Sequence, residues 1–300
     1  MTTSIAEAIL QGAYQLRQAG VAEARREAGS LLAHVIDRDR SFILSHAEDP
    51  ISAKQFEQFH VDLNRRAQRE PLQYITGHQE FFGLDFEVTS DVLIPRPETE
   101  LLVEIALRLA ADLEAPFLCD VGTGSGCIAI TLLHELPEIS RARAVAVDIS
   151  PAALAVAKRN AARHSVTELI DFVISDCFAS LDRADPRQSS FDLIVSNPPY
   201  VEERALPGLQ KEVRDYEPRM ALSAGADGLA IIRRLLLDAG SFLKIGGHFL
   251  FEIGFNQSEA VEQLIDPQRW KLLEIHQDLQ GIPRIVELEN VASKTKSEQK

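Results

Sequence analysis

The sequence contains few cysteines and no pattern of metal ligands. Only three of its 300 residues are cysteine, Cys119, Cys127 and Cys177, and no two of them form a Cys-x-x-Cys pair. The eight histidines are scattered without the spacing of metal ligands. An odd number of unpaired cysteines argues against a disulfide framework, and the histidines argue against a zinc site. We therefore expect no structural disulfide and no bound metal.

Long apolar runs are also missing. The longest ones are far shorter than the roughly 20 residues that a membrane-spanning helix needs. The N-terminal segment carries Glu7 and other polar residues, whereas a signal peptide has a basic start and an apolar centre. We therefore expect a cytoplasmic protein that does not contact a membrane.

Basic residues are outnumbered by acidic ones. The chain has 31 lysines and arginines against 45 aspartates and glutamates, which gives a formal net charge of −14. A protein that holds nucleic acid through its phosphates needs clustered lysine and arginine. The charge therefore disfavours direct binding of nucleic acid.

Hydrophobic residues, by contrast, make up 45% of the sequence, which is enough for sizeable cores, and the length permits two domains. The first part has helical patterns. Ser4 with Glu7, and Ser52 with Gln55, form capping boxes ahead of apolar stripes with helical spacing. We predict a helical domain over residues 1–70 and interpret it as a substrate-docking domain.

The pattern changes between residues 71 and 95. Phe82 and Phe86 belong to an alternating apolar series around Gly83, which is typical of a half-buried hairpin. We interpret this stretch as a hairpin linker. At its end the two prolines of residues 94–100, Ile-Pro-Arg-Pro-Glu-Thr-Glu, favour an extended approach to a helix.

Strand and helix patterns alternate through the rest of the chain. This order predicts a parallel sheet with helices on both faces, in a domain that spans residues 96–291. We expect the polar tail, residues 292–300, to be disordered. The predicted strands lie at residues 117–121, 144–148, 170–174, 191–196, 248–253, 272–275 and 285–288.

A glycine-rich loop follows the first of these strands. Residues 120–126 read Asp-Val-Gly-Thr-Gly-Ser-Gly, at the place where a doubly wound sheet binds a ligand. The spacing is Gly-x-Gly-x-Gly, which differs from the dinucleotide fingerprint, and the Lys-Ser or Lys-Thr of a phosphate loop is missing. The loop therefore favours a ligand without a pyrophosphate.

The next two strands end in aspartates. From its position, Asp148 can accept hydrogen bonds from both hydroxyls of a ribose. Asp176 can accept from an exocyclic amine while a neighbouring side chain lies against a purine. Either aspartate alone is more typical of a helix cap or a turn. In order after the glycine loop, however, they describe a nucleoside pocket without phosphate groups, as S-adenosylmethionine requires.

The fourth strand ends in Ser196-Asn197-Pro198-Pro199-Tyr200. Two prolines lack N–H groups, so they cannot extend a sheet and instead present carbonyls from a stiff turn. Asn197 adds a carbonyl oxygen from its side chain. These acceptors suit a planar NH2 group, with Tyr200 covering its face. The alternative interpretation is an ordinary turn after a strand.

Together these motifs resemble class I S-adenosylmethionine-dependent methyltransferases. The chain is most similar to the HemK-type protein-(glutamine-N5) methyltransferases, which modify class I peptide-chain release factors, and the resemblance covers almost the whole length. DNA adenine and some RNA guanine methyltransferases are similar at residues 197–200, so the more specific segment is Arg96 to Glu100. A related family that methylates a ribosomal protein differs there. The resemblance implies a Rossmann-like, mostly parallel seven-stranded sheet with a small all-α N-terminal domain.

The resemblance also implies roles for individual residues. Asp148 would hold the ribose, and Asp176 and Cys177 would lie at the adenine. The family often has a tryptophan at position 177, so Phe178 is the alternative for covering the adenine. Asn197 would lie between cofactor and substrate. The loop residues around the methionine and sulfonium would be Gly122, Thr123, Gly124, Ser125 and Gly126, and the glutamine amide would be bound by Asn197, Pro198, Pro199 and Tyr200.

We accordingly predict methyl transfer from S-adenosylmethionine to a glutamine side-chain amide of a class I release factor, by a monomer. Asn197, Pro198 and Tyr200 are the predicted catalytic residues. The side-chain oxygen of Asn197 would accept one N–H, and the Pro198 carbonyl the other. The alternatives are methylation of a ribosomal-protein glutamine or of an exocyclic amine in nucleic acid, and a scaffold that binds cofactor without catalysis.

Overall fold

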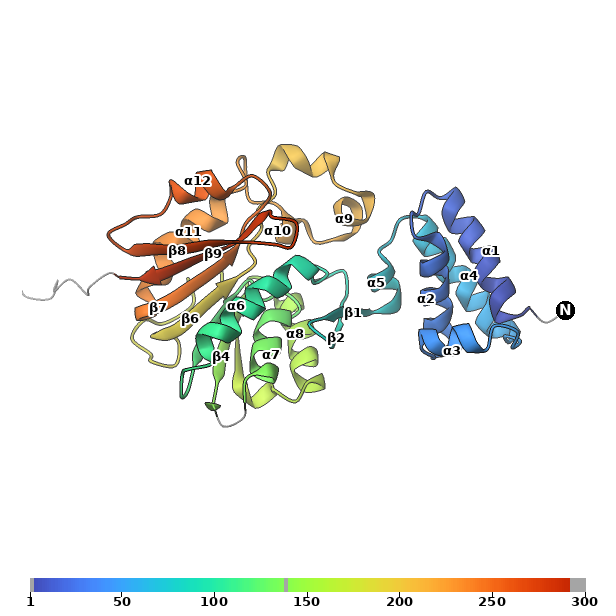
Figure 1. The fold of residues 1–300 in the computed structure, drawn as a ribbon, viewed down its shortest axis with the longest axis horizontal. Helices are drawn as coiled ribbons and strands as arrows, with labels where there is room; N and C mark the ends of the chain where they lie inside the picture. Colours follow the sequence, from blue (N-terminus) through green and yellow to red (C-terminus); the bar gives the residue numbers. More distant parts are fainter. Residues whose placement is uncertain (1–2, 138–139, 292–300) are drawn as a thin grey trace, which may run out of the picture. The chain divides into compact units, whose positions relative to one another are not determined.

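The computed structural model describes residues 3–137 and 140–291. The tail predicted for residues 292–300 lies outside the described residues. The chain divides into two compact units (Figure 1). Unit 1 comprises residues 1–78 and 209–216, and unit 2 comprises residues 79–208 and 217–300.

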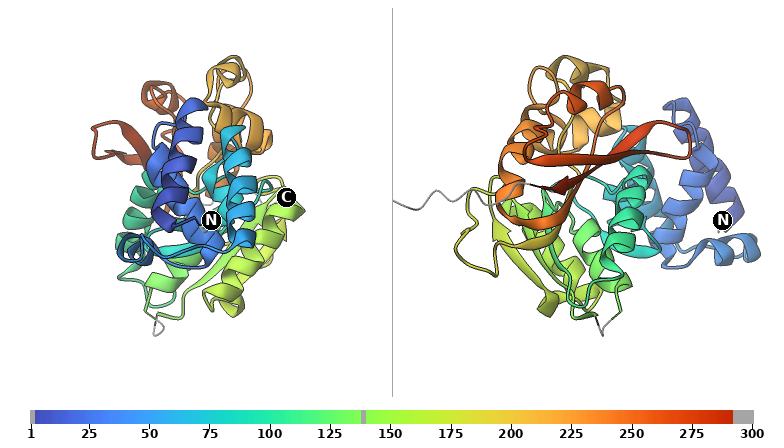
Figure 2. Two further views of the ribbon diagram at one scale, coloured as in Figure 1. Left: turned by 90° about the vertical axis from the view of Figure 1, so that its right-hand side faces the viewer. Right: turned by 60° about the vertical axis from the view of Figure 1, so that its left-hand side comes forward.

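Unit 1 is built from helices around one apolar core. Both predicted capping boxes are present: Ser4 accepts from the backbone N–H of Glu7, and Ser52 from that of Gln55. Leu16, Leu31 and Phe59 on the three longest helices are fully buried in the core, and these helices lie side by side (Figure 2). The helices are α1 (Ile5–Gln18), α2 (Ala24–Ile36), α3 (Arg40–Ser45), α4 (Ala53–Ala67), α5 (Leu72–Thr76) and α9 (Lys211–Tyr216).

Helix α9 joins unit 1 although its sequence lies between strands of unit 2. The Glu212 carboxylate accepts from the guanidinium groups of Arg66, at 3.1 Å, and Arg69, at 2.9 Å. The Tyr216 hydroxyl donates to the backbone carbonyl of Gln68 at 2.9 Å. Sequence reasoning did not predict this, because the partners are more than 100 residues apart in the chain.

Unit 2 holds a seven-stranded sheet in the order β5-β4-β3-β6-β7-β9-β8. Strands β3 to β7 pair in parallel, and β9 runs antiparallel between β7 and β8. This confirms the predicted mostly parallel sheet of a class I methyltransferase. Its strands are β3 (Phe117–Val121), β4 (Arg143–Asp148), β5 (Ile170–Ile174), β6 (Phe191–Ser196), β7 (Leu243–Glu252), β8 (Trp270–Gln277) and β9 (Pro283–Asn290).

Helices cover both faces of this sheet. Neighbouring residues of β6, Leu193 and Ile194, belong to different apolar cores, because successive side chains of a strand point to opposite faces. One core contains residues of α6 (Glu100–Ala110), α7 (Cys127–Glu135) and α8 (Pro151–Arg163). The other contains residues of α11 (Ala230–Asp238) and α12 (Ser258–Glu262).

Shorter elements complete unit 2. The hairpin expected within residues 71–95 is formed by β1 (His78–Phe81) and β2 (Leu84–Glu87). The other short elements are η1 (Pro97–Thr99), η3 (Thr167–Leu169), η4 (Glu203–Gly208), α10 (Arg219–Leu222) and η5 (Ala239–Ser241).

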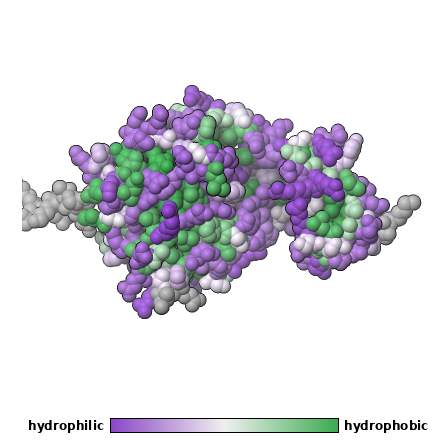
Figure 3. Space-filling model, viewed as in Figure 1, coloured by the Kyte–Doolittle hydropathy of each residue, from purple (hydrophilic) through white to green (hydrophobic). Residues whose placement is uncertain are grey.

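Three observations concern features that the composition argued against: a membrane-spanning helix, a metal site and disulfides. Across residues 3–137 and 140–291, no helix is both long and apolar enough to cross a membrane, and the face in Figure 3 carries hydrophilic residues between its apolar areas. Within the same residues, no group of three or more His, Cys, Asp or Glu side chains is placed to hold a metal ion. All three cysteines are free thiols.

Candidate active site

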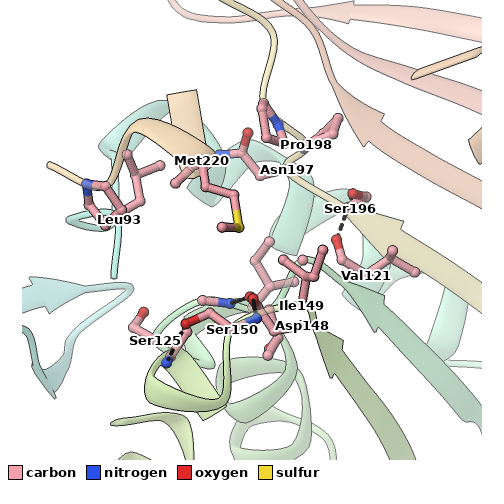
Figure 4. A pocket seen from close by; sticks show the side chains of 18 of the residues that line it. Leu93, Val121, Ser125, Asp148, Ile149, Ser150, Ser196, Asn197, Pro198 and Met220 are labelled. Atoms are coloured by element: carbon pink, nitrogen blue, oxygen red, sulfur yellow. Dashed lines mark hydrogen bonds between the residues drawn. The ribbon is translucent and has the colours of Figure 1, made fainter. Parts of the chain in front are cut away.

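A cavity lies at the carboxyl edge of the sheet in unit 2 (Figure 4). Strands β3, β4, β5 and β6 run parallel, so the loops that follow them meet at one edge. The cavity is lined by residues from all four of these loops, together with residues from 91–99 and 218–221. The structure thus brings together the four strand ends that the sequence singled out.

The glycine loop after β3 forms one wall. Gly122 and Gly124 have positive φ angles, +76° and +55°, and a β-carbon added at either would meet no atom within 4 Å. The backbone is therefore open to a close ligand. Gly126 differs: it does not line the cavity, and a β-carbon there would lie 2.7 Å from Cδ1 of Ile130. Gly126 therefore allows close packing at the start of α7.

Asp120 lies behind this loop. Its Oδ2 accepts from the Thr123 hydroxyl at 2.6 Å and from the Ala129 backbone N–H at 3.2 Å. Its Oδ1 has no partner among the described residues. Because the side chain is buried, the pKa of Asp120 is raised to about 7. Asp120 ties the glycine loop to the start of α7, a role that sequence reasoning did not assign.

Asp148 closes β4 at the cavity. Its Oδ2 accepts from the Gly124 backbone N–H at 2.8 Å, and its Oδ1 accepts from that of Ser150 at 2.9 Å. Burial raises its pKa. Each carboxylate oxygen has a second lone pair, so Asp148 can still accept from two ribose hydroxyls.

Asp176 and Cys177, the residues predicted to lie at the adenine, line the cavity after β5. The carboxylate of Asp176 is paired with Arg234 at 2.9 Å. Phe178 is buried and stacks on Phe242, with ring centroids 4.9 Å apart, so it belongs to the core of the sheet. Phe178 is therefore not placed to cover an adenine in the cavity. Of the two predicted alternatives, Cys177 is the one that lines the cavity.

Several apolar cavity residues were missed by the sequence analysis. Ile149 lines the cavity and is 47% exposed. Its position directly after Asp148 at the end of a strand is the sequence signal that could have found it. The Met220 side chain is 62% exposed and points into the cavity between Asn197 and Asp148 (Figure 4). Met220 belongs to a short helix without a periodic pattern. The sequence suggested a substrate loop or a solvated connection for residues 201–227, but it did not single out Met220.

The turn after β6 forms the neighbouring wall. Asn197, Pro198 and Pro199 line the cavity, and the Ser196 hydroxyl donates to the Val121 backbone carbonyl at 2.7 Å (Figure 4). That bond holds the turn beside the glycine loop. The predicted acceptor turn and the predicted cofactor loop are therefore adjacent.

Two further side chains, those of Thr99 and Glu252, support this turn from behind. The Asn197 Nδ2 donates to the Thr99 hydroxyl at 2.9 Å, and that hydroxyl donates to Glu252 Oε2 at 2.6 Å. The Tyr200 hydroxyl donates to Glu252 Oε1 at 3.2 Å. Burial raises the pKa of Glu252 to about 7. Tyr200 does not line the cavity, so the covering of a substrate by its ring stays a prediction.

Arg96 is the single cationic side chain among the described residues that line the cavity. Its guanidinium donates to the Glu217 carboxylate at 2.6 Å, so its charge is already paired. Phosphate groups are commonly held by free arginine or lysine. This lining therefore suits a nucleoside without phosphates better than a dinucleotide.

Solved methyltransferase structures share the fold over about three quarters of the chain. The hMettl16 catalytic domain, solved with an RNA hairpin, matches with a TM-score of 0.55 at 17% identity over 78% of this chain and 82% of that chain. A methyltransferase from Pyrococcus furiosus matches with a TM-score of 0.51 at 16% identity over 77% and 99%. At such identities the likeness establishes the methyltransferase fold.

Sequence relatives are much more similar. The PrmC N-terminal domain family matches residues 7–77, and the methyltransferase small domain family matches residues 98–212. The release factor glutamine methyltransferase of Koribacter versatilis is 42% identical over 90% of this chain and 93% of its own length. That of Cereibacter sphaeroides is 41% identical over 94% and 96%. The chain belongs to the family of release factor glutamine methyltransferases.

Proposed function

We propose that this chain transfers a methyl group from S-adenosylmethionine to the side-chain amide nitrogen of a glutamine in a class I peptide-chain release factor. The observation that carries the proposal is one cavity lined by both the glycine loop with Asp148 and the Asn197-Pro198-Pro199 turn. The name of the relatives supports a release factor as the substrate. The enzyme would act as a monomer in the cytoplasm, where release factors function.

The cavity residues fit S-adenosylmethionine. The open space beside Gly122 and Gly124 suits the methionine part, and the carboxylate of Asp148 suits the ribose hydroxyls. Ile149 and Cys177 offer apolar surface for the adenine. When bound, the cofactor supplies the electrophilic methyl group.

The turn after β6 would bind the substrate. An amide nitrogen is a poor nucleophile because its lone pair is delocalised into the carbonyl group. The Asn197 side-chain oxygen and the Pro198 backbone carbonyl would each accept one N–H, which fixes the amide plane and aims the nitrogen. Proline suits this position because it has no N–H of its own.

The same contacts would give specificity for glutamine. A glutamate side chain has no N–H to offer, so each buried acceptor left unpaired would cost on the order of 1 to 3 kcal/mol. No side chain needs to remove a proton before transfer. The amide nitrogen becomes strongly acidic once it is methylated, and its proton can then leave to solvent.

The alternative substrates use the same chemistry. A ribosomal-protein glutamine presents the same amide, and an exocyclic amine of nucleic acid presents a similar planar NH2 group. The net charge of −14 argues against nucleic acid, because counterion release on phosphates needs clustered basic residues.

The test is a transfer assay with labelled methyl groups. The full chain is incubated with a release factor, with ribosomal protein, with RNA and with DNA in separate reactions. We expect label in the release factor, and loss of that label when the acceptor glutamine is replaced by glutamate. Label that enters only ribosomal protein or nucleic acid would contradict the proposal.

A further inference from the structure

A chain of hydrogen bonds runs from the buried end of β7 to the cavity. The Thr99 hydroxyl is its middle member: it donates to Glu252 Oε2 at 2.6 Å and accepts from Asn197 Nδ2 at 2.9 Å. Thr99 is 2% exposed and Glu252 is 1% exposed. Water therefore has little access to replace either partner.

The ionised form of Glu252, which prevails above about pH 7, gives this series of hydrogen bonds a direction. An ionised carboxylate has acceptors only, so the single proton of the Thr99 hydroxyl must be donated to Glu252. The hydroxyl can then only accept from its other neighbour. Only the NH2 end of the Asn197 amide can satisfy it, and the amide oxygen is thereby turned away from Thr99. Without the carboxylate, either end of the amide could face the hydroxyl.

The same carboxylate reaches the far end of the turn. The Tyr200 hydroxyl donates to Glu252 Oε1, so both oxygens of Glu252 hold groups connected with the turn of residues 197–200. Burial and Glu98 favour the protonated form of Glu252, whereas Thr99, Tyr200 and Arg284 favour the ionised form.

We propose that Glu252 is a positioning residue, which through Thr99 orients the Asn197 amide so that its oxygen, and not its nitrogen, meets the NH2 group of the substrate. The inference rests on the proposed function, because an oriented acceptor matters only if the substrate presents N–H groups. It extends that function by assigning the preference for glutamine over glutamate to a residue that does not touch the substrate.

The test compares Thr99→Val and Glu252→Gln with Thr99→Ser, which keeps the hydroxyl. Glu287→Gln is the matched control, because Glu287 is a buried glutamate of neighbouring β9 that accepts from His276 and does not line the cavity. We expect kcat on the release factor to fall about 10- to 100-fold in Thr99→Val and Glu252→Gln, as for a lost charge-assisted hydrogen bond. Thr99→Ser and Glu287→Gln should stay within a few-fold of wild type.

A second readout distinguishes a change in the orientation of the Asn197 amide from a general loss of structure at the site. With Asn197 free to turn, its NH2 group can face the substrate and donate to a carboxylate. A release factor with glutamate at the acceptor position should therefore compete better against the glutamine form in Thr99→Val than in wild type. The affinity for S-adenosylmethionine, measured by calorimetry, should change less than twofold.

The pH profile of kcat gives a third readout. The pKa of Glu252 is about 7, so lowering the pH through 7 adds a proton that can be donated to Thr99. The hydroxyl can then donate to Asn197, and turnover should fall on the acidic side. Thr99→Val should lack this acidic limb, because its side chain cannot pass the change on.

Failure of the positioning role of Glu252 can be told apart from failure of the proposed function. If wild type methylates the release factor and both Thr99→Val and Glu252→Gln keep wild-type kcat, the positioning role is overturned while the function stands. If wild type does not methylate the release factor, the proposed function fails instead. Should Glu252→Gln not fold, the pair Thr99→Val and Thr99→Ser decides, and equal kcat in the two would overturn the role.

Discussion

The two walls of the cavity are each supported by a buried carboxylate, Asp120 behind the glycine loop and Glu252 behind the Asn197 turn. Both side chains are 1% exposed, and burial raises the pKa of each to about 7. Their partners differ. Asp120 holds groups three and nine residues away, whereas Glu252 holds hydroxyls 153 and 52 residues away.

This difference shows that the two carboxylates support the cavity in different ways, one within a loop and the other between distant segments. Asp120 fixes the shape of a local loop, and one of its oxygens has no partner among the described residues. Glu252 joins η1, β7 and the turn after β6, and both of its oxygens accept from hydroxyls. We expect changes in the first wall to alter cofactor binding, and changes in the second to alter turnover.

The largest effect is expected from Asn197→Ala. This variant removes the proposed acceptor for the substrate amide, so kcat should fall by about 100-fold or more, as when one oriented group of an active site is lost. The affinity for S-adenosylmethionine, measured by calorimetry, should stay within a few-fold of wild type. Wild-type turnover in this variant would remove Asn197 from the mechanism.

Asp148→Ala should give the opposite pattern. Asp148 is the proposed ligand of the ribose hydroxyls and also accepts from the Gly124 N–H, so its loss should raise the Kd for S-adenosylmethionine about 10- to 100-fold. At saturating cofactor, kcat should remain within a few-fold of wild type. An unchanged Kd would show that the ribose is held elsewhere, and the distinction between the walls would fail.

Asp120→Asn tests whether the carboxyl group behind the glycine loop makes the free energy of unfolding depend on pH. The folded protein keeps the Asp120 proton up to about pH 7, whereas the unfolded chain loses it near pH 3.8. This proton therefore stabilises the fold at low pH, and the contribution is lost as the pH rises to about 7.

In Asp120→Asn, the free energy of unfolding should accordingly fall less steeply between about pH 4 and 7, by up to about 1.4 kcal/mol per pH unit. Urea titrations at several pH values measure the slope. Glu252→Gln should flatten the same profile, and only Glu252→Gln should also reduce kcat strongly. A slope equal to that of wild type in Asp120→Asn would contradict the raised pKa.

The smallest effect is expected from Cys177→Trp. Cys177 lines the cavity, and its φ of +52° is already in the left-handed region, so tryptophan adds no new requirement on φ. Stacking of the indole on the adenine should lower the Kd for S-adenosylmethionine a few-fold. Cys177→Leu is the control for added bulk. An equal gain from leucine, or no gain from tryptophan, would count against stacking at this position.

The central strands could be predicted closely from the sequence. Residues 117–121 and 191–196 match β3 and β6, because strands buried on both faces appear as continuous apolar runs. Residues 170–174 match edge strand β5, although Asp171 and Ile174 are exposed. Strand β7 begins at Leu243, earlier than the predicted 248, since Gly246 and Gly247 interrupt the apolar pattern. Edge strand β8 extends beyond the predicted residues 272–275 at both ends. The prediction was too short because most of its middle residues are exposed and give no clear apolar pattern.

The site was predicted only as far as local motifs reach. The glycine loop, Asp148 and the Asn197 turn each follow a strand, so their meeting at one edge follows from parallel order. The contact between Thr99 and Glu252 spans 153 residues and depends on tertiary packing that no motif records. For the same reason, the sequence did not predict that helix α9 packs in unit 1, because its partners there lie far away in the chain.

The most direct measurement is mass spectrometry of a release factor that has been incubated with the full chain and S-adenosylmethionine. We predict one added methyl group, mapped by peptide fragmentation to the side-chain amide of a single glutamine. Asn197→Ala should leave that peptide unmodified under the same conditions. A methyl group on any other residue type, or none on a folded release factor, would contradict the central claim.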